Sequence, residues 1–125
     1  MWGQLGIVGR MRDSILNAGE KVHVIHRRHF DSEPHRHFVG TVNEYEDGVV
    51  RMTGHVFAVD PTTFQFVRRP EIRTRVVSVV SGEVIVNVLP PSVDLAKVVY
   101  RVEGTSVRVS DGSAWYLDIS EVGWR

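Results

Sequence analysis

The sequence predicts a mainly β domain preceded by a short helix. Valine accounts for 24 of the 125 residues, and β-branched side chains favour the pleated, half-buried surface of a sheet. Turn signals recur every ten or so residues, which is the spacing of hairpins in a barrel or sandwich. The composition, 42% apolar and 24% charged, is that of a globular protein. Because no linker, repeat or low-complexity segment interrupts the chain, we expect residues 1–125 to form a single domain.

Charge and cysteine content exclude several classes of protein. Fifteen basic and fifteen acidic residues give a formal charge of zero, which removes the simplest argument for a nucleic-acid binder. The absence of cysteine excludes disulfides, thiolate metal sites and cysteine nucleophiles. Neither a bilayer-spanning stretch nor a signal-peptide pattern is visible. We therefore expect a cytoplasmic location and no membrane partner.

Helical periodicity is confined to the N-terminus. Apolar residues recur there at steps of three and four, which places them on one face of a helix: Leu5, Val8, Met11, Ile15 and Leu16. Gly19 can end this helix in the left-handed conformation. The pattern predicts an N-terminal arm and helix over residues 1–19, with the helix itself at about residues 10–18.

Strands are predicted from residue 21 onward. Residues 21–30 and 35–46 flank a short loop and form the first hairpin. Asp47-Gly48 then supplies the two positive φ angles of a type I′ turn. Pairing around this turn places Glu46 opposite Val49 and Tyr45 opposite Val50, and it brings Glu44 beside Arg51.

The later strands are shorter. A third strand ends near residue 60, residues 64–68 form a fourth, and Pro70 interrupts pairing because it has no amide donor. Residues 74–80 and 83–89 are predicted to form a tight hairpin at Ser81-Gly82. After the two prolines at positions 90 and 91, three more strands are expected at residues 97–103, 106–110 and 114–119.

Two stretches resemble the motifs of the Sm-like family of small β-barrels. The first is FVGTV at residues 38–42 followed by Tyr45, Asp47 and Met52, and the second is VSVVSGEV at residues 77–84. The resemblance covers roughly residues 10–90. It implies a short N-terminal helix followed by a small, strongly bent antiparallel β-barrel at residues 21–90. Residues 91–125 would then add C-terminal β-hairpins. It also implies a homo-oligomer, because Sm-like barrels close rings through exposed edge strands.

The RNA-binding positions of that family are not matched. Sm-like proteins carry an asparagine after the acidic turn and an Arg-Gly pair in the second turn. Here the first turn continues as Val49-Val50-Arg51 and the second reads Ser81-Gly82. A nucleic-acid partner is therefore not favoured.

Histidines gather in the first predicted hairpin. The six are His23, His26, His29, His35, His37 and His55. If Phe30 pairs with His35, then His26, His35 and His37 share one face of the sheet, where imidazoles could bind a transition metal. The alternative is a solvated hairpin, since the arginines at positions 27, 28 and 36 would repel a cation.

Arginine outnumbers lysine 13 to 2. Guanidinium groups suit bidentate binding of phosphate or carboxylate, so one cluster is a candidate nucleic-acid or anion site: Arg27, Arg28, Arg68, Arg69, Arg73 and Arg75. The alternative is that these side chains pair with Asp and Glu, which the zero net charge favours.

Catalysis has no signature in the sequence. There is no glycine-flanked nucleophile elbow and no His-Glu zinc helix. The leading interpretation is a non-enzymatic oligomeric binding or scaffold module of Sm-like type, with no cofactor. Two alternatives stay open: a metal-binding β-barrel that uses the histidine-rich hairpin, and a weak, sequence-independent nucleic-acid or anion binder that uses the arginines.

Overall fold

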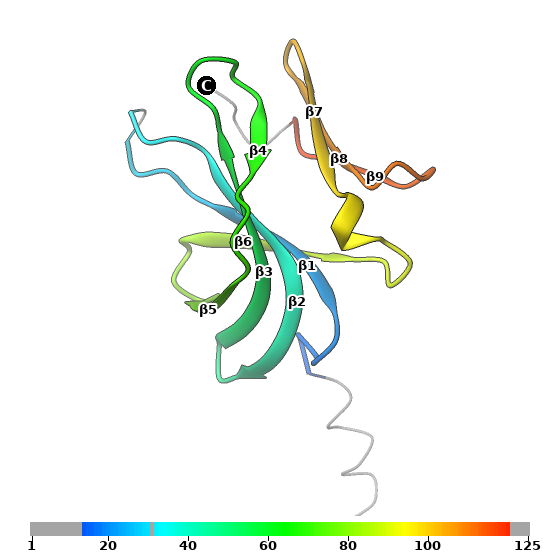
Figure 1. Cartoon of the computed structure of the whole chain (residues 1–125). Helices are drawn as coiled ribbons and strands as arrows, with labels where there is room; N and C mark the ends of the chain where they lie inside the picture. The colour runs from blue at the N-terminus through cyan, green and yellow to red at the C-terminus, as the bar shows by residue number, and fades with distance from the viewer. Residues whose placement is uncertain (1–13, 31, 121–125) are drawn as a thin grey trace, which may run out of the picture.

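The structure is a computed structural model that describes residues 14–30 and 32–120, and it is mainly antiparallel β-sheet (Figure 1). Its strands are β1 (Lys21–His26), β2 (Arg36–Glu46), β3 (Val49–Val59), β4 (Phe66–Arg68), β5 (Arg73–Ser78), β6 (Val84–Leu89), β7 (Val99–Glu103), β8 (Ser106–Ser110) and β9 (Tyr116–Asp118). A single turn of 3-10 helix, η1 (Leu95–Lys97), precedes β7. It is too short to cross a membrane, and the described part of the chain has no helix that could.

The strands form two sheets. Sheet A has the order β4-β3-β2-β1-β6, and β5 pairs with β3 beyond the point where β4 ends. Sheet B has the order β7-β8-β9 and contains the three C-terminal strands that the sequence predicted. The predicted turn between β2 and β3 is confirmed, because Asp47 and Gly48 have φ angles of 48° and 83°. Its predicted register is confirmed too, since Glu44 pairs with Arg51 across the ladder and their side chains meet at 2.9 Å.

Sheet A is strongly curled, and two facing glycines permit its closest backbone approach. Gly40 of β2 lies directly opposite Gly54 of β3. A Cβ atom added to Gly40 would collide with the carbonyl of Thr53, and one added to Gly54 would collide with the carbonyl of Val39. A bulge between Val42 and Glu44 bends β2 further.

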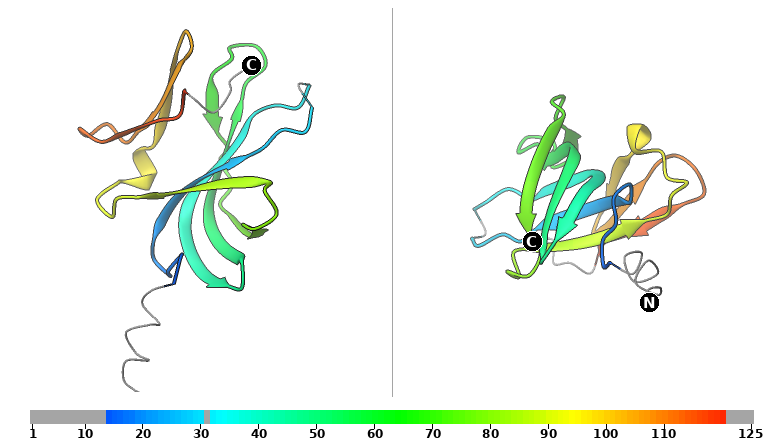
Figure 2. Two further views of the ribbon diagram at one scale, coloured as in Figure 1. Left: turned by 180° about the vertical axis from the view of Figure 1, so that it is seen from behind. Right: turned by 90° about the horizontal axis from the view of Figure 1, so that it is seen from below.

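Each face of sheet A buries a separate apolar core. The first core lies inside the curl and consists of Leu16, Val22, Val24, Phe38, Val42, Val50, Met52 and Val56. The second core lies between the other face and sheet B, which packs against it (Figure 2), and consists of Ile25, Val39, Phe57, Leu89, Val93, Val98, Tyr100, Val107, Val109 and Ile119. Because both faces are covered, β1 reads as a nearly continuous buried strand with only its ends half-exposed.

The predicted N-terminal helix is wrong over its described part. Residues 14–18 form bends and a turn. The Asn17 amide donates to the Glu20 carboxylate at 2.6 Å, a local side-chain bond that competes with helical hydrogen bonding. Leu16 reaches the first core from this turn and is 4% exposed. Residues 10–13 of the predicted helix lie outside the described residues.

The predicted closed barrel and the hairpin between residues 74–80 and 83–89 are also wrong. β5 pairs with β3 and β6 pairs with β1, so the ladder never closes between β5 and β6. The side chains of Arg73 and Arg75 give a physical reason for the open ladder. Arg75 pairs with Met52, which belongs to the first core, and therefore points to the inside of the curl. Closure would bury guanidinium groups, which is strongly unfavourable without a partner charge.

We predict that Gly40→Ala destabilises the fold by about 3 kcal/mol or more, because the new methyl group meets fixed backbone. Urea denaturation would measure the loss. The matched control is Gly104→Asn, at an exposed turn with φ 61° and open space around it, where asparagine tolerates the backbone. An unchanged midpoint for Gly40→Ala would contradict the role given to the glycine pair.

Candidate functional site

Two histidines and a tyrosine form a polar cluster at the centre of the second core. His23 of β1 and His37 of β2 are 0% and 1% exposed, and both contact the Tyr100 hydroxyl of β7. The hydroxyl lies 2.9 Å from His23 Nε2 and 2.8 Å from His37 Nδ1, while these two nitrogens are 3.1 Å apart. Asn87 of β6 approaches the other nitrogen of His23 at 3.2 Å.

The donors and acceptors of this cluster can be assigned. The Asn87 Nδ2 group only donates, so His23 Nδ1 accepts and the His23 proton lies on Nε2. His23 Nε2–H donates to the Tyr100 hydroxyl, which in turn donates to His37 Nδ1. Both imidazoles are then neutral, and each atom within the triangle has a partner.

Burial keeps these rings neutral. It lowers the pKa of His23 to about 4. Burial, followed by the nearby His23, His35 and His26, lowers the pKa of His37 to about 2. Burial also raises the pKa of Tyr100. Since an added proton would occupy an accepting nitrogen and place a charge in an apolar core, the cluster works as a neutral contact between the two sheets.

The predicted histidine set is not brought together as proposed. β1 and β2 pair with His26 opposite Arg36 and Ile25 opposite His37, whereas the prediction paired Phe30 with His35. This register puts His26 on the first-core face and His37 on the second-core face. Within residues 14–30 and 32–120, no three His, Cys, Asp or Glu side chains are grouped so that they could hold a metal ion.

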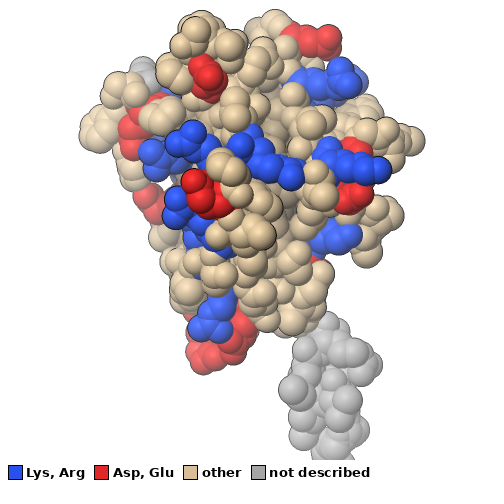
Figure 3. All heavy atoms as spheres, viewed as in Figure 1, with Lys and Arg blue, Asp and Glu red and all other residues tan. Residues whose placement is uncertain are grey.

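The predicted arginine set is divided among separate places. Arg27 donates to the Gly82 carbonyl at 3.3 Å, and Arg28 donates to the Glu33 carbonyl at 3.2 Å. Arg68 faces η1, and Arg69 is exposed after β4. Arg73 and Arg75 lie on β5, and basic side chains form a band across the face of the molecule that carries β3, β4 and β5 (Figure 3).

Arg36 joins the two arginines of β5, although the anion site predicted from the sequence did not include it. Arg36 lies two residues before Phe38 on β2. Because side chains two residues apart in a strand point to the same face, Arg36 shares the first-core face with Phe38. The Arg75 guanidinium lies 5.9 Å from the Phe38 ring. Desolvation, then Arg73 and Arg36, lower the pKa of Arg75.

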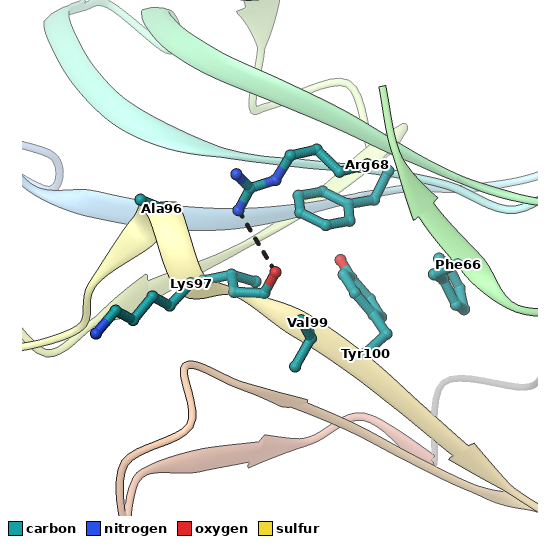
Figure 4. A pocket seen from close by; sticks show the side chains of 8 residues that line it. Phe66, Arg68, Ala96, Lys97, Val99 and Tyr100 are labelled. Carbon is teal, nitrogen blue, oxygen red and sulfur yellow. Dashed lines mark hydrogen bonds between the residues drawn. The ribbon is translucent and has the colours of Figure 1, made fainter. Parts of the chain in front are cut away.

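A shallow groove of about 330 Å³ lies between β4 and the η1 segment (Figure 4). Phe66 and Tyr100 stack along it with ring centroids 4.3 Å apart. Arg68 crosses the groove and donates to the carbonyls of Leu95 at 2.8 Å and Val98 at 3.5 Å. The main contacts of Arg68 are therefore within the chain, where it ties η1 to sheet A.

Comparison with protein-family models, with curated proteins and with solved structures finds no match for this chain.

We predict that the free energy of unfolding is greatest above pH 6.5 and falls as the pH decreases from 6.5 towards 4. In the unfolded chain His23 and His37 bind protons near pH 6.5, whereas the native state holds them neutral to about pH 4 and below. Each group contributes about 1.4 kcal/mol per pH unit, so the two together lose on the order of 4 kcal/mol by pH 5. Urea denaturation at a series of pH values would measure this. The exposed-site control His29→Gln should retain the dependence, and a flat profile between pH 7 and 5 would refute the assignment.

We also predict a loss of about 1 to 2 kcal/mol for Tyr100→Phe. The loss is small because His23 Nε2 lies 3.1 Å from His37 Nδ1 and can donate to it directly once the hydroxyl is removed. Thermal or urea denaturation would test this, with Tyr116→Phe, whose side chain is half-exposed, as a control that should be neutral. A loss above about 4 kcal/mol would mean that the imidazoles do not form the direct bond.

Proposed function

We propose that this chain is a non-enzymatic scaffold module whose copies join edge to edge, with β6 of one copy pairing with β5 of the next. The observation that carries the proposal is the outer edge of β6. This strand, Val84–Leu89, has the sequence VIVNVL and contains neither a charge nor a proline. Such an unprotected edge is a template for pairing with another chain.

Every second residue of β6 points its backbone amide and carbonyl away from β1. Arg27 N donates to Glu83 O at 2.8 Å, which makes this an internally hydrogen-bonded pair. By the alternation of an antiparallel ladder, the amides and carbonyls of Val84, Val86 and Val88 point away from β1. Among the described residues, no strand pairs with these three positions of β6.

β5 offers a matching edge at the opposite side of sheet A. Val79 N donates to Gly48 O at 2.8 Å, so by the same alternation Thr74, Val76 and Ser78 direct their backbone groups away from β3. β5 and β6 are each six residues long. The exposed apolar side chains Val76 and Val88, which are 63% and 49% exposed, would be covered by such pairing.

The symmetry of the assembly follows from the two edges. Because β5 and β6 are different surfaces, a contact between them is heterologous. Copies joined in this way form a ring if the rotation from one copy to the next adds up to a full turn, and a filament if it does not. The resemblance to Sm-like barrels, which close rings through edge strands, supports the ring. A scaffold role also agrees with the enclosure of His23 and His37, whose pKa values are the most strongly shifted of the histidines and which are withdrawn from solvent.

We predict that the chain sediments as an oligomer and that Val88→Lys weakens the association at least tenfold, because a charge is placed on the paired edge. Sedimentation velocity over a range of protein concentration would measure this. The matched control is Val49→Lys, a residue with similar exposure, 40%, on β3, which has a neighbour on each side.

A second variant tests the backbone directly. Val88→Pro removes one outward amide while leaving the ladder to β1 intact, a position that proline tolerates on an edge strand. It should dissociate the oligomer without unfolding the chain. A wild-type chain that stays monomeric at the highest soluble concentration, or an oligomer that both Val88 variants leave unchanged, would refute edge pairing.

A further inference from the structure

Positive charge accumulates on the inner face of sheet A beside the gap in the ladder between β5 and β6. The charged side chains come from strands far apart in the sequence: Arg36 from β2, and Arg73 and Arg75 from β5. Arg73 pairs with Gly54 and Arg75 pairs with Met52. Both side chains therefore share the face of β3 that carries the first core.

Among the described residues, these three guanidinium groups have no close ion-pair partner, although Arg36 interacts at longer range with the Glu33 carboxylate. Arg36, Arg73 and Arg75 have no carboxylate within 4 Å among the described residues, in contrast to Arg51, which pairs with Glu44 at 2.9 Å. Desolvation, followed by the like charges of Arg73 and Arg36, lowers the pKa of Arg75. Three guanidinium groups held together with no carboxylate within 4 Å among the described residues create a positive potential there that favours an anion.

His26 adds a buried polar atom at the same place. It lies opposite Arg36 in the ladder. Its Nε2 atom is buried and has no hydrogen-bond partner among the described residues. Burial, followed by Arg75 and Arg36, lowers the pKa of this imidazole, so at neutral pH it is an uncharged ring that can donate one hydrogen bond to an incoming oxygen.

The donors of these side chains suit an anionic group with several oxygen atoms. Phe38 lies under the Arg75 guanidinium at 5.9 Å, a cation–π distance that limits the freedom of that side chain. Each guanidinium presents a fixed fork of donors that matches the oxygens of phosphate in a bidentate manner. A lysine cluster would supply charge without this geometry.

We propose that Arg36, Arg73 and Arg75, with His26, form a binding site for a phosphate group beside the open edge of β5. All four residues come from one chain, so the site exists in the monomer and does not depend on the assembly proposed above. The phosphate group belongs either to a small phosphate compound or to the phosphodiester backbone of a single-stranded nucleic acid. The chemistry of recognition is the same for both.

Titration of the Val88→Lys variant with pyrophosphate and, separately, with a labelled single-stranded RNA tests the proposal without interference from association. Calorimetry or fluorescence anisotropy gives the affinity, and the His26 ring signals in NMR spectra report the place of binding. We expect at least one of the two probes to bind and to shift the His26 signals. Arg75→Gln should weaken that binding at least tenfold, and Arg36→Gln, on a different strand, should do the same. For RNA held by three arginines, the slope of log affinity against log salt should be about −2.

The control is Arg101→Gln, an exposed arginine on β7 in sheet B, which should leave the affinity unchanged. Binding of pyrophosphate alone identifies a small phosphate compound, and binding of RNA alone identifies a phosphodiester ligand. The proposal is overturned if neither probe binds at low salt, or if Arg75→Gln and Arg101→Gln weaken binding equally. A thermal melt shows whether each variant is folded, and Arg75→Gln should fold because it removes like-charge repulsion.

Discussion

The contact between Tyr100 and two buried imidazoles is the interaction on which the arrangement of the sheets depends. His23 and His37 are buried beside the apolar residues of the second core, and an unpaired imidazole there would be unfavourable. The Tyr100 hydroxyl both accepts and donates, so one side chain from sheet B serves both rings of sheet A. Asn87 fixes the proton on His23 from the other side. This contact joins β7 of sheet B to β1 and β2 of sheet A.

Local features of this fold were predictable from the sequence, and long-range ones were not. The Asp47-Gly48 turn carries its own geometry, so its flanking register followed from two residues. The strand positions of sheet B followed from their turns for the same reason. The first hairpin was misread because its loop has no such turn. The prediction paired Phe30 with His35, whereas the structure pairs His26 with Arg36. The two registers are shifted by an odd number of residues, so the side chains of one strand move to the opposite face of the sheet.

The candidate sites show the same limit. The run of arginines around Pro70 was recognised as a cluster, but its partner from β2, Arg36, was not included in the predicted site because only the three-dimensional pairing brings the two strands together. Alternation along β5 placed Arg73, Arg75 and Val77 on one side of the strand, and had β3 been recognised as its neighbour, these arginines would have argued against a closed barrel. Tyr100 had no sequence signal at all, since nothing in the order of residues links position 100 to positions 23 and 37.

The wide separation of these three positions also has a consequence for the order in which the chain can fold. β1, β2 and β3 form a contiguous meander that can pair as soon as residue 59 is available. β6 and Tyr100 come much later in the chain, so one face of the meander stays open to water during that interval. Until the last third of the chain covers His23 and His37, the burial that lowers the pKa of both side chains in the folded chain is incomplete. Covering of these two side chains by sheet B therefore releases protons in mildly acidic solution, and its equilibrium depends on pH.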